Sequence, residues 1–279
     1  MKLGRAIAGA IALALAAAPV GLVDPLLGTG VAAAQDSSVQ AVSSHFTPEQ
    51  AAGFSKQMER DLAAKGARVA MVFRAGRARD KLPEGIAYTH GAFWVHRTIK
   101  TATGEPAEGY AVYNLYAGDG DNWGKTESRL VQDWPFEFTR ASTVDDMAVI
   151  IPSPEVQRRL LAVIDSPTYA KLHNPAYSLV SNPFERKYQN CNSFMLNVLG
   201  AAIWDTADPA RIALDLKAHF KPTIVKTSAV VRLFGPIADQ RLRTDDQKGP
   251  VRTVTYESLA GFLKTNGMLQ ETYVLNYRP

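Results

Sequence analysis

A succession of apolar, strand-like segments in the first half of the chain most constrains its fold. Arg68–Arg74, Ala87–Arg97 and Tyr110–Ala117 are rich in aromatic and β-branched residues, which favour β-strands. The stretch Thr98–Gly109 between the last two contains glycine and proline and is typical of a hairpin loop. Because a short loop joins antiparallel strands, these segments predict an antiparallel sheet.

Helical patterns accompany these strands. Thr47 and Gln50 form a capping-box signature, and the helix that it opens should run to Lys65 with one apolar face. The segment Cys191–Trp204 is strongly apolar and predicts a buried helix. The other expected elements, in chain order, are a helix at Lys125–Gln132, a strand at Met147–Ile151, a helix from Ser153 to Ile164, a short strand at Tyr177–Val180, helices at Pro209–His219, Ser228–Leu233 and Tyr256–Asn266, and a closing strand at Glu271–Tyr277.

The fold class that these elements predict is α+β, with an antiparallel sheet of about five or six strands. The apolar helix that begins at Cys191 should pack across this sheet. The mature chain shows no internal repeat and no low-complexity linker, so residues 47–279 are expected to form one domain.

The N-terminus has the pattern of a secretory signal. Lys2 and Arg5 precede the apolar run Ile7–Ala18, and the small residues 32–34 form a cleavage site. Proline, glycine and aspartate interrupt the run before it reaches the length of a membrane span, which favours cleavage over an uncleaved anchor. We therefore expect a signal peptide at 1–34, a flexible leader at 35–46 and a periplasmic or secreted protein without a later transmembrane segment.

The charge of the chain argues against a nucleic-acid partner. The formal net charge is +4, and removal of Lys2, Arg5 and Asp24 with the signal lowers it by one. The basic residues are scattered rather than clustered, which is typical of a mixed, solvated surface.

Cys191 is the single cysteine of the chain, which is unusual for an exported protein of this size. Asn190 is a good helix cap and would place Cys191 in the first turn, where the backbone N–H groups and the helix dipole favour a thiolate. The same N–H groups could hold an oxyanion. The alternative is that Cys191 is a small hydrophobic residue of the core.

A catalytic thiol also needs a base, and histidine has a suitable pKa. Of the five histidines, His90 and His96 lie six residues apart on one expected strand and therefore on one face. His90 is near the start of the strand. Asn114, on the next strand, could orient the imidazole. Each of these residues could instead be a satisfied core or edge residue.

The order of these features resembles the circularly permuted NlpC-type branch of the papain-like cysteine peptidases. The segments that carry the resemblance are Arg68–Arg74, Tyr88–Val95, Tyr110–Tyr116 and Tyr188–Leu196. The mature chain also resembles an uncharacterised exported bacterial family placed near that branch. The resemblance implies a permuted papain-like fold with Cys191 as nucleophile, His90 as base and Asn114 or His96 as the third residue. It implies no metal or cofactor.

The leading hypothesis is a periplasmic cysteine hydrolase, or an acyl transferase of the same chemistry, acting on an amide or ester. Its substrate would be an unidentified amide or ester, with cell-wall peptides and lipids as candidates. Tyr88 and Tyr188 could help to hold the oxyanion, and Trp123 could line the substrate site within the segment 118–138, together with Trp134. The alternative is a non-catalytic binding or scaffold protein of the cell envelope on the same fold.

Overall fold

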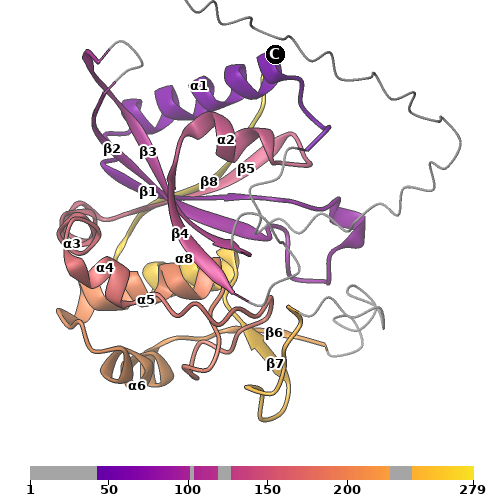
Figure 1. The fold of residues 1–279 in the computed structure, drawn as a ribbon, viewed down its shortest axis with the longest axis vertical. Helices are drawn as coiled ribbons and strands as arrows, with labels where there is room; N and C mark the ends of the chain where they lie inside the picture. Colours follow the sequence, from indigo (N-terminus) through magenta and orange to yellow (C-terminus); the bar gives the residue numbers. More distant parts are fainter. Residues whose placement is uncertain (1–42, 101–103, 119–126, 227–240) are drawn as a thin grey trace, which may run out of the picture. The chain divides into compact units, whose positions relative to one another are not determined.

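A six-stranded antiparallel sheet forms the centre of the computed structural model, which describes residues 43–100, 104–118, 127–226 and 241–279 (Figure 1). The strands follow the order β4-β3-β2-β1-β5-β8. Their bounds are β1 Val69–Arg74, β2 His90–Lys100, β3 Pro106–Ala117, β4 Ser128–Asp133, β5 Asp146–Pro152 and β8 Leu269–Asn276. A separate pair joins β6 Thr223–Val225 to β7 Val251–Thr253.

Helices cover both faces of the six-stranded sheet (Figure 1). One face carries α1 Pro48–Ala64 and α2 Pro135–Arg140. The other face carries α3 Pro154–Ile164, α4 Pro167–Lys171, α5 Cys191–Trp204 and α8 Tyr256–Thr265, and α6 Pro209–His219 packs against α5. This is the α+β class that the sequence predicts, with an antiparallel sheet and the cysteine-bearing helix packed on it.

The local sequence explains the helix α1. Thr47 Oγ1 accepts a hydrogen bond from the Gln50 backbone at 3.2 Å, and the Gln50 side chain accepts one from the Thr47 backbone at 2.9 Å. Proline stands at the first helical position, where its missing N–H is not needed. The buried residues recur at helical spacing and face the sheet: Ala51, Phe54, Ser55, Met58 and Leu62. The predicted capping box is confirmed.

The central strand β1 is buried along its whole length, because helices cover both of its faces. Alternate residues of β1 point to opposite faces of the sheet and pack in the two hydrophobic cores on those faces. Val69, Met71 and Phe73 pack with α5, whereas Ala70 and Val72 pack with α1. Burial on two faces accounts for the continuous apolar run of this strand.

Two sequence predictions differ from the structure. The segment 128–133 is the edge strand β4 rather than part of a helix, since its residues pair with β3 from Val112–Asp133 to Ala117–Ser128. Tyr177–Val180 forms no strand and only an isolated bridge between Tyr177 and Gln189. The expected helix 228–233, the signal peptide 1–34 and most of the leader lie outside the described residues. No helix in the described part of the chain has the length and apolar character needed to cross a membrane.

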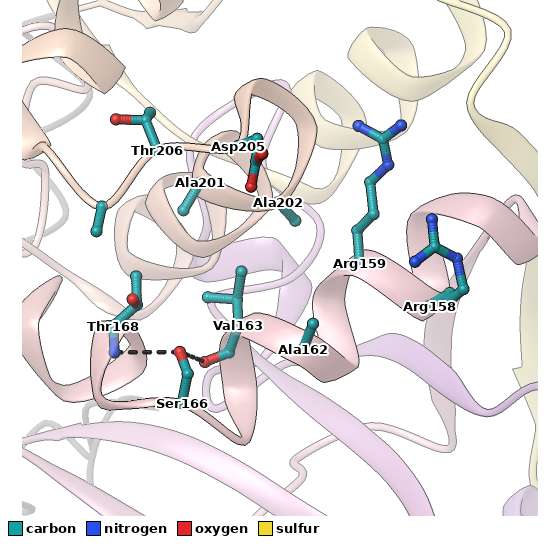
Figure 2. Close-up of a pocket in the computed structure, with 11 residues that line it drawn as sticks. Arg158, Arg159, Ala162, Val163, Ser166, Thr168, Ala201, Ala202, Asp205 and Thr206 are labelled. Atoms are coloured by element: carbon teal, nitrogen blue, oxygen red, sulfur yellow. Dashed lines mark hydrogen bonds between the residues drawn. The ribbon is translucent and has the colours of Figure 1, made fainter.

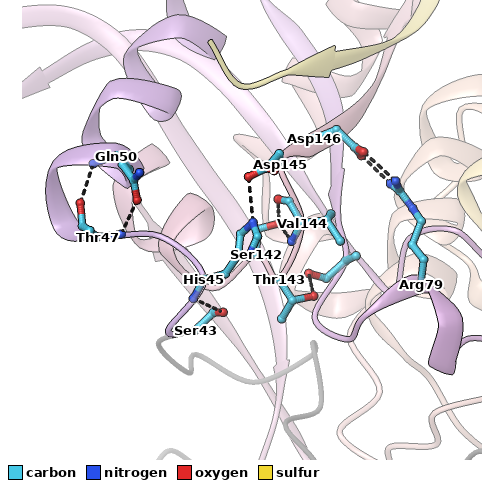
Figure 3. A network of polar contacts seen from close by, with 11 residues as sticks. Ser43, His45, Thr47, Gln50, Arg79, Ser142, Thr143, Val144, Asp145 and Asp146 are labelled. Carbon is cyan, nitrogen blue, oxygen red and sulfur yellow. Dashed lines mark hydrogen bonds and ion pairs between the residues drawn. The ribbon is translucent and has the colours of Figure 1, made fainter. Parts of the chain in front are cut away.

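The described end of the expected leader, residues 43–46, packs on the domain instead of remaining free (Figure 3). The Ser43 N–H donates to the Arg140 carbonyl at 3.0 Å, and His45 Nε2 lies 2.9 Å from Asp145 Oδ1. Phe46 is buried, with its ring 5.8 Å from Phe54. These contacts place the start of the ordered domain a few residues before α1.

The helix α5 is almost entirely buried, as expected for a helix that is apolar all round. The predicted range Cys191–Trp204 is confirmed. Gly91 on β2 lets the first turn of α5 approach the sheet closely. A Cβ atom at Gly91 would lie 2.7 Å from Asn192 Oδ1 and 2.7 Å from Phe73 Cε1.

Replacement of Gly91 by alanine should therefore destabilise the fold. The methyl group overlaps a packed side chain and a ring, and overpacking of this kind costs about 1–3 kcal/mol. Urea denaturation of G91A should show a lower midpoint with an unchanged slope. Gly261→Ala is the matched control, because a Cβ there meets nothing within 4 Å and alanine favours the helix α8. Equal midpoints for wild type and G91A would contradict the close approach.

Candidate functional site

Cys191 is the first residue of α5, as the sequence predicts, and Asn190 and Ser193 form a capping box around it. Asn190 Oδ1 accepts from the Ser193 backbone at 2.9 Å, and Ser193 Oγ accepts from the Asn190 backbone at 2.8 Å. The thiol is 2% exposed, and its Sγ lies 4.0 Å from the carbonyl oxygen of Thr89. The nucleophile candidate thus touches the residue that precedes His90.

The His90 imidazole is held by Asn114. Its Nε2 lies 3.0 Å from Asn114 Oδ1, and its Nδ1 is buried without a hydrogen-bond partner. An amide oxygen accepts, so in this arrangement Nε2 carries the proton and Nδ1 presents a lone pair. The structure therefore brings together the predicted base and the predicted orienting residue. The free nitrogen is the one that could accept a proton.

The side chains of Cys191 and His90 lie on different faces of the sheet. Gly91 faces α5, so its neighbour His90 points to the other face, where its ring contacts Phe138 of α2 at 5.6 Å. Cys191 belongs to the core on the α5 face. The thiol contacts the carbonyl oxygen of Thr89, the residue before His90, beyond the last β2–β3 pair at Phe93 and Tyr113. No hydrogen bond between the thiol and the imidazole is present, so the expected direct pair is not formed.

The surroundings of His90 keep its imidazole neutral. Burial lowers the pKa of His90 well below its ordinary value, and the positive charge of Arg74 lowers it further, whereas the Asn114 hydrogen bond raises it. Arg74 is the cross-strand neighbour of His90 on β1. Tyr116 stacks on the imidazole at 5.2 Å with an angle of 10° between the rings. A neutral imidazole is the form that acts as a general base.

Arg74, Tyr116 and Phe138 are contacts of His90 that the sequence analysis did not identify. Arg74 carried a usable signal, because a charged residue ends an otherwise apolar buried strand. Phe138 lies on a short helix that no pattern indicated.

His96, the competing third residue, is far from His90. Six strand residues span about 20 Å, and the His96 imidazole instead lies 3.7 Å from Glu108 and packs edge-on against Tyr110. Of the two alternatives for the third residue, Asn114 is the one that contacts His90.

The structure does not direct the expected substrate-binding aromatics toward the thiol. The Tyr88 hydroxyl donates to Asp146 Oδ1 at 2.8 Å, beside the pair of hydrogen bonds between Arg79 and Asp146 (Figure 3). The Tyr188 ring is buried under Arg243, whose guanidinium carbon lies 3.8 Å from the ring centroid. Trp123 lies outside the described residues, and Trp134 is 40% exposed at the start of α2.

A second histidine lies close to α5. His173 Nε2 is 3.0 Å from Ser128 Oγ, and its ring packs edge-on against Phe194 at 6.3 Å. Burial lowers the pKa of His173. Because Ser128 Oγ also faces the carbonyl oxygens of Asn174 and Pro175, this pair ties β4 to the loop that follows α4.

Two pockets flank α5. One, of about 350 Å³, lies beside the first half of the helix and is lined by Tyr188, Gln189 and Asn197 among others. The other, of about 490 Å³, lies between α3, α4 and the C-terminal end of α5 (Figure 2). Its floor at Ala201 is ten residues from Cys191, about 15 Å along the axis. The first pocket is therefore the nearer of the two to Cys191 along the helix, although Cys191 lines neither pocket.

Among the described residues, no group of three histidine, cysteine, aspartate or glutamate side chains is arranged to hold a metal ion.

A family model described as "Uncharacterized protein conserved in bacteria (DUF2145)" matches residues 61–263, which include Cys191, His90 and Asn114. No curated protein and no solved structure matches the chain.

Proposed function

Because the matched region covers well over half of the sequence, the chain belongs to this uncharacterised bacterial family, and we propose that it is a cysteine hydrolase of the cell envelope. The observation that carries the proposal is the state of His90. Its imidazole is oriented through Nε2 by Asn114, burial lowers its pKa so that it is neutral, and its Nδ1 has no hydrogen-bond partner. The preceding residue, Thr89, contacts the Cys191 thiol.

The chemistry would follow a thiol–imidazole mechanism. His90 Nδ1 takes the proton of the Cys191 thiol, and the thiolate attacks the carbonyl carbon of an amide or ester. The first-turn N–H groups of α5 stabilise the oxyanion, apart from that of Ser193, which already donates to Asn190 Oδ1. The imidazolium then protonates the leaving amine or alcohol, and a thioester remains. Water, or an acceptor alcohol or amine, releases the acyl group and regenerates the thiol.

The arrangement supports the permuted papain-like resemblance as part of this proposal. The base precedes the nucleophile in the chain, an amide holds the imidazole from the neighbouring strand, and the thiol opens a helix. For the thiol to reach Nδ1, the side chains must approach through the end of the β2–β3 pair, where strand pairing has ceased. Catalytic hydrogen bonds are often long in unliganded enzymes and shorten when substrate binds.

A non-catalytic binding or scaffold role is the second candidate. The observation that favours it is burial, since Cys191 is 2% exposed, His90 is 0% exposed and no hydrogen bond joins them. In this case Cys191 is a packing residue, and the His90–Asn114 pair satisfies buried polar groups.

Alkylation of the folded protein by iodoacetamide separates the two candidates. If Cys191 is catalytic, it should react at pH 6–7 faster than a free thiol of ordinary pKa, about 8.5. Mass spectrometry should locate the adduct at Cys191, the single cysteine of the chain. Glutathione provides the reference rate at each pH.

The control is the same reaction in 6 M guanidinium chloride, where the chain is unfolded and neither burial nor neighbouring residues affect the reactivity of the Cys191 thiol. A native thiol that remains unmodified while the unfolded one reacts at the reference rate would refute the hydrolase proposal. That outcome would assign Cys191 to the core and support the scaffold role.

A further inference from the structure

The pocket beside the first half of α5 has a definite position relative to the thiol. Tyr188 and Gln189, two of its lining residues, lie two or three positions before Cys191. Asn197, another lining residue, lies six positions after it on the same helix, about 9 Å along the axis. The pocket thus adjoins the residues just before Cys191 and the second turn of α5.

The charged side chains of the pocket are mainly cationic. Its lining includes the cations Lys171 and Arg186, the single carboxylate Glu185 and the half-buried His173. Lys171 and Arg186 form no ion pair within the described part of the chain. Arg243, stacked on the outer side of Tyr188, adds a further positive charge nearby. Such a site favours an anion.

Three hydrogen bonds, one of them buried, hold the walls of the pocket. Gln189 Nε2 donates to the Leu172 carbonyl at 3.0 Å, and Gln189 Oε1 accepts from the Asn174 backbone at 2.8 Å. Asn174 Nδ2 donates in turn to the Arg186 carbonyl at 2.8 Å. These bonds join the segment that follows α4, whose last residue is Lys171, to the loop that carries Arg186, so both cations belong to the lining of one preformed cavity.

The remaining residues that line the pocket are apolar, and they form a surface that a short hydrocarbon or peptide group could contact. It consists of Leu172, Pro175, Pro183, Pro209 and Ala213. A volume of about 350 Å³ accommodates a group the size of one or two amino acids and is at the low end of known ligand pockets.

We infer that this pocket binds a carboxylate of the substrate through Lys171 and Arg186, so that the substrate is a small acidic amide or ester rather than a lipid. The inference rests on the proposed hydrolase function. Arginine can bind a carboxylate with two parallel hydrogen bonds, and lysine adds a point charge.

The test measures binding without turnover. ¹⁵N-labelled protein carrying Cys191→Ala is titrated with N-acetylglycine and, separately, with the neutral N-acetylglycinamide, and amide shifts are followed by NMR. The acid should cause saturable shifts at residues 171–175, 183–189 and 197, with an affinity that falls as salt is added. The amide should bind about tenfold more weakly.

The double variant Lys171→Ala/Arg186→Ala should weaken binding of the acid about tenfold. Lys264→Ala is the matched control, because Lys264 is an exposed lysine of α8 that does not line the pocket. Equal binding of acid and amide, shifts elsewhere, or no saturation at 50 mM would overturn the inference. Since binding needs no thiol, such a failure would leave the alkylation result unaffected.

Discussion

Replacement of His90 by alanine should lower the rate of Cys191 acylation about 10²- to 10⁴-fold, the range that a general base contributes. The thiol contacts the Thr89 carbonyl oxygen and Asn192 Oδ1, neither of which is basic enough to remove its proton, so the helix dipole would have to favour the thiolate without a base from His90. The measurement is the burst of p-nitrophenolate from p-nitrophenyl acetate, with mass spectrometry to locate the acetyl thioester.

His96→Ala is the matched control for this prediction. His96 lies on the same strand and the same face, but it contacts Glu108 and Tyr110 instead of Asn114. It should leave the burst rate unchanged. Thermal unfolding by circular dichroism verifies that both variants are folded. A folded His90→Ala protein with the wild-type rate would exclude His90 as the base.

The elements that the sequence predicts best are those whose pattern arises from burial. The range of α5 is correct because an apolar helix packed on all sides is apolar all along its length. The edge strand β4 was predicted as a helix, because its residues are polar and half-exposed and its strand conformation depends on pairing with β3. Helix α2 has six residues and no side-chain cap, which leaves little local signal.

In the site, too, contacts that follow from neighbouring strands could be predicted from the sequence, whereas contacts that depend on packing of distant segments could not. Asn114 and His90 could be paired from sequence, because adjacent antiparallel strands place residues of matching parity on one face. Tyr88 and Tyr188 were expected near the thiol on sequence proximity alone. The Tyr88 hydroxyl instead donates to Asp146, and Arg243 stacks on the Tyr188 ring. Both partners come from distant segments of the chain. The face from which Cys191 approaches His90 likewise depends on packing of α5 against Gly91.

The buried, neutral His90 should also make stability fall as the pH decreases below about 6.5. The groups that face it are Arg74 on β1, Asn114 and Tyr116 on β3, and Phe138 on α2, and none is a carboxylate. Burial and Arg74 lower the pKa of His90 well below its ordinary value of 6.5, so protonation disfavours the folded state. At a pH between the pKa of His90 in the folded protein and its pKa in the unfolded chain, the unfolded chain binds a proton that the folded chain does not.

With this sign, the unfolding free energy decreases by up to about 1.4 kcal/mol for each pH unit below 6.5. Between pH 7 and pH 5 the unfolding free energy of the wild type should therefore decrease, and His90→Gln should remove this contribution, because glutamine keeps an N–H for Asn114 but does not titrate. Urea denaturation at several pH values gives the slope. His219→Gln, an exposed histidine at the end of α6, is the control. Identical slopes for wild type and His90→Gln would show that the pKa of His90 is the same in the folded and the unfolded chain, and would contradict the prediction that burial and Arg74 lower it.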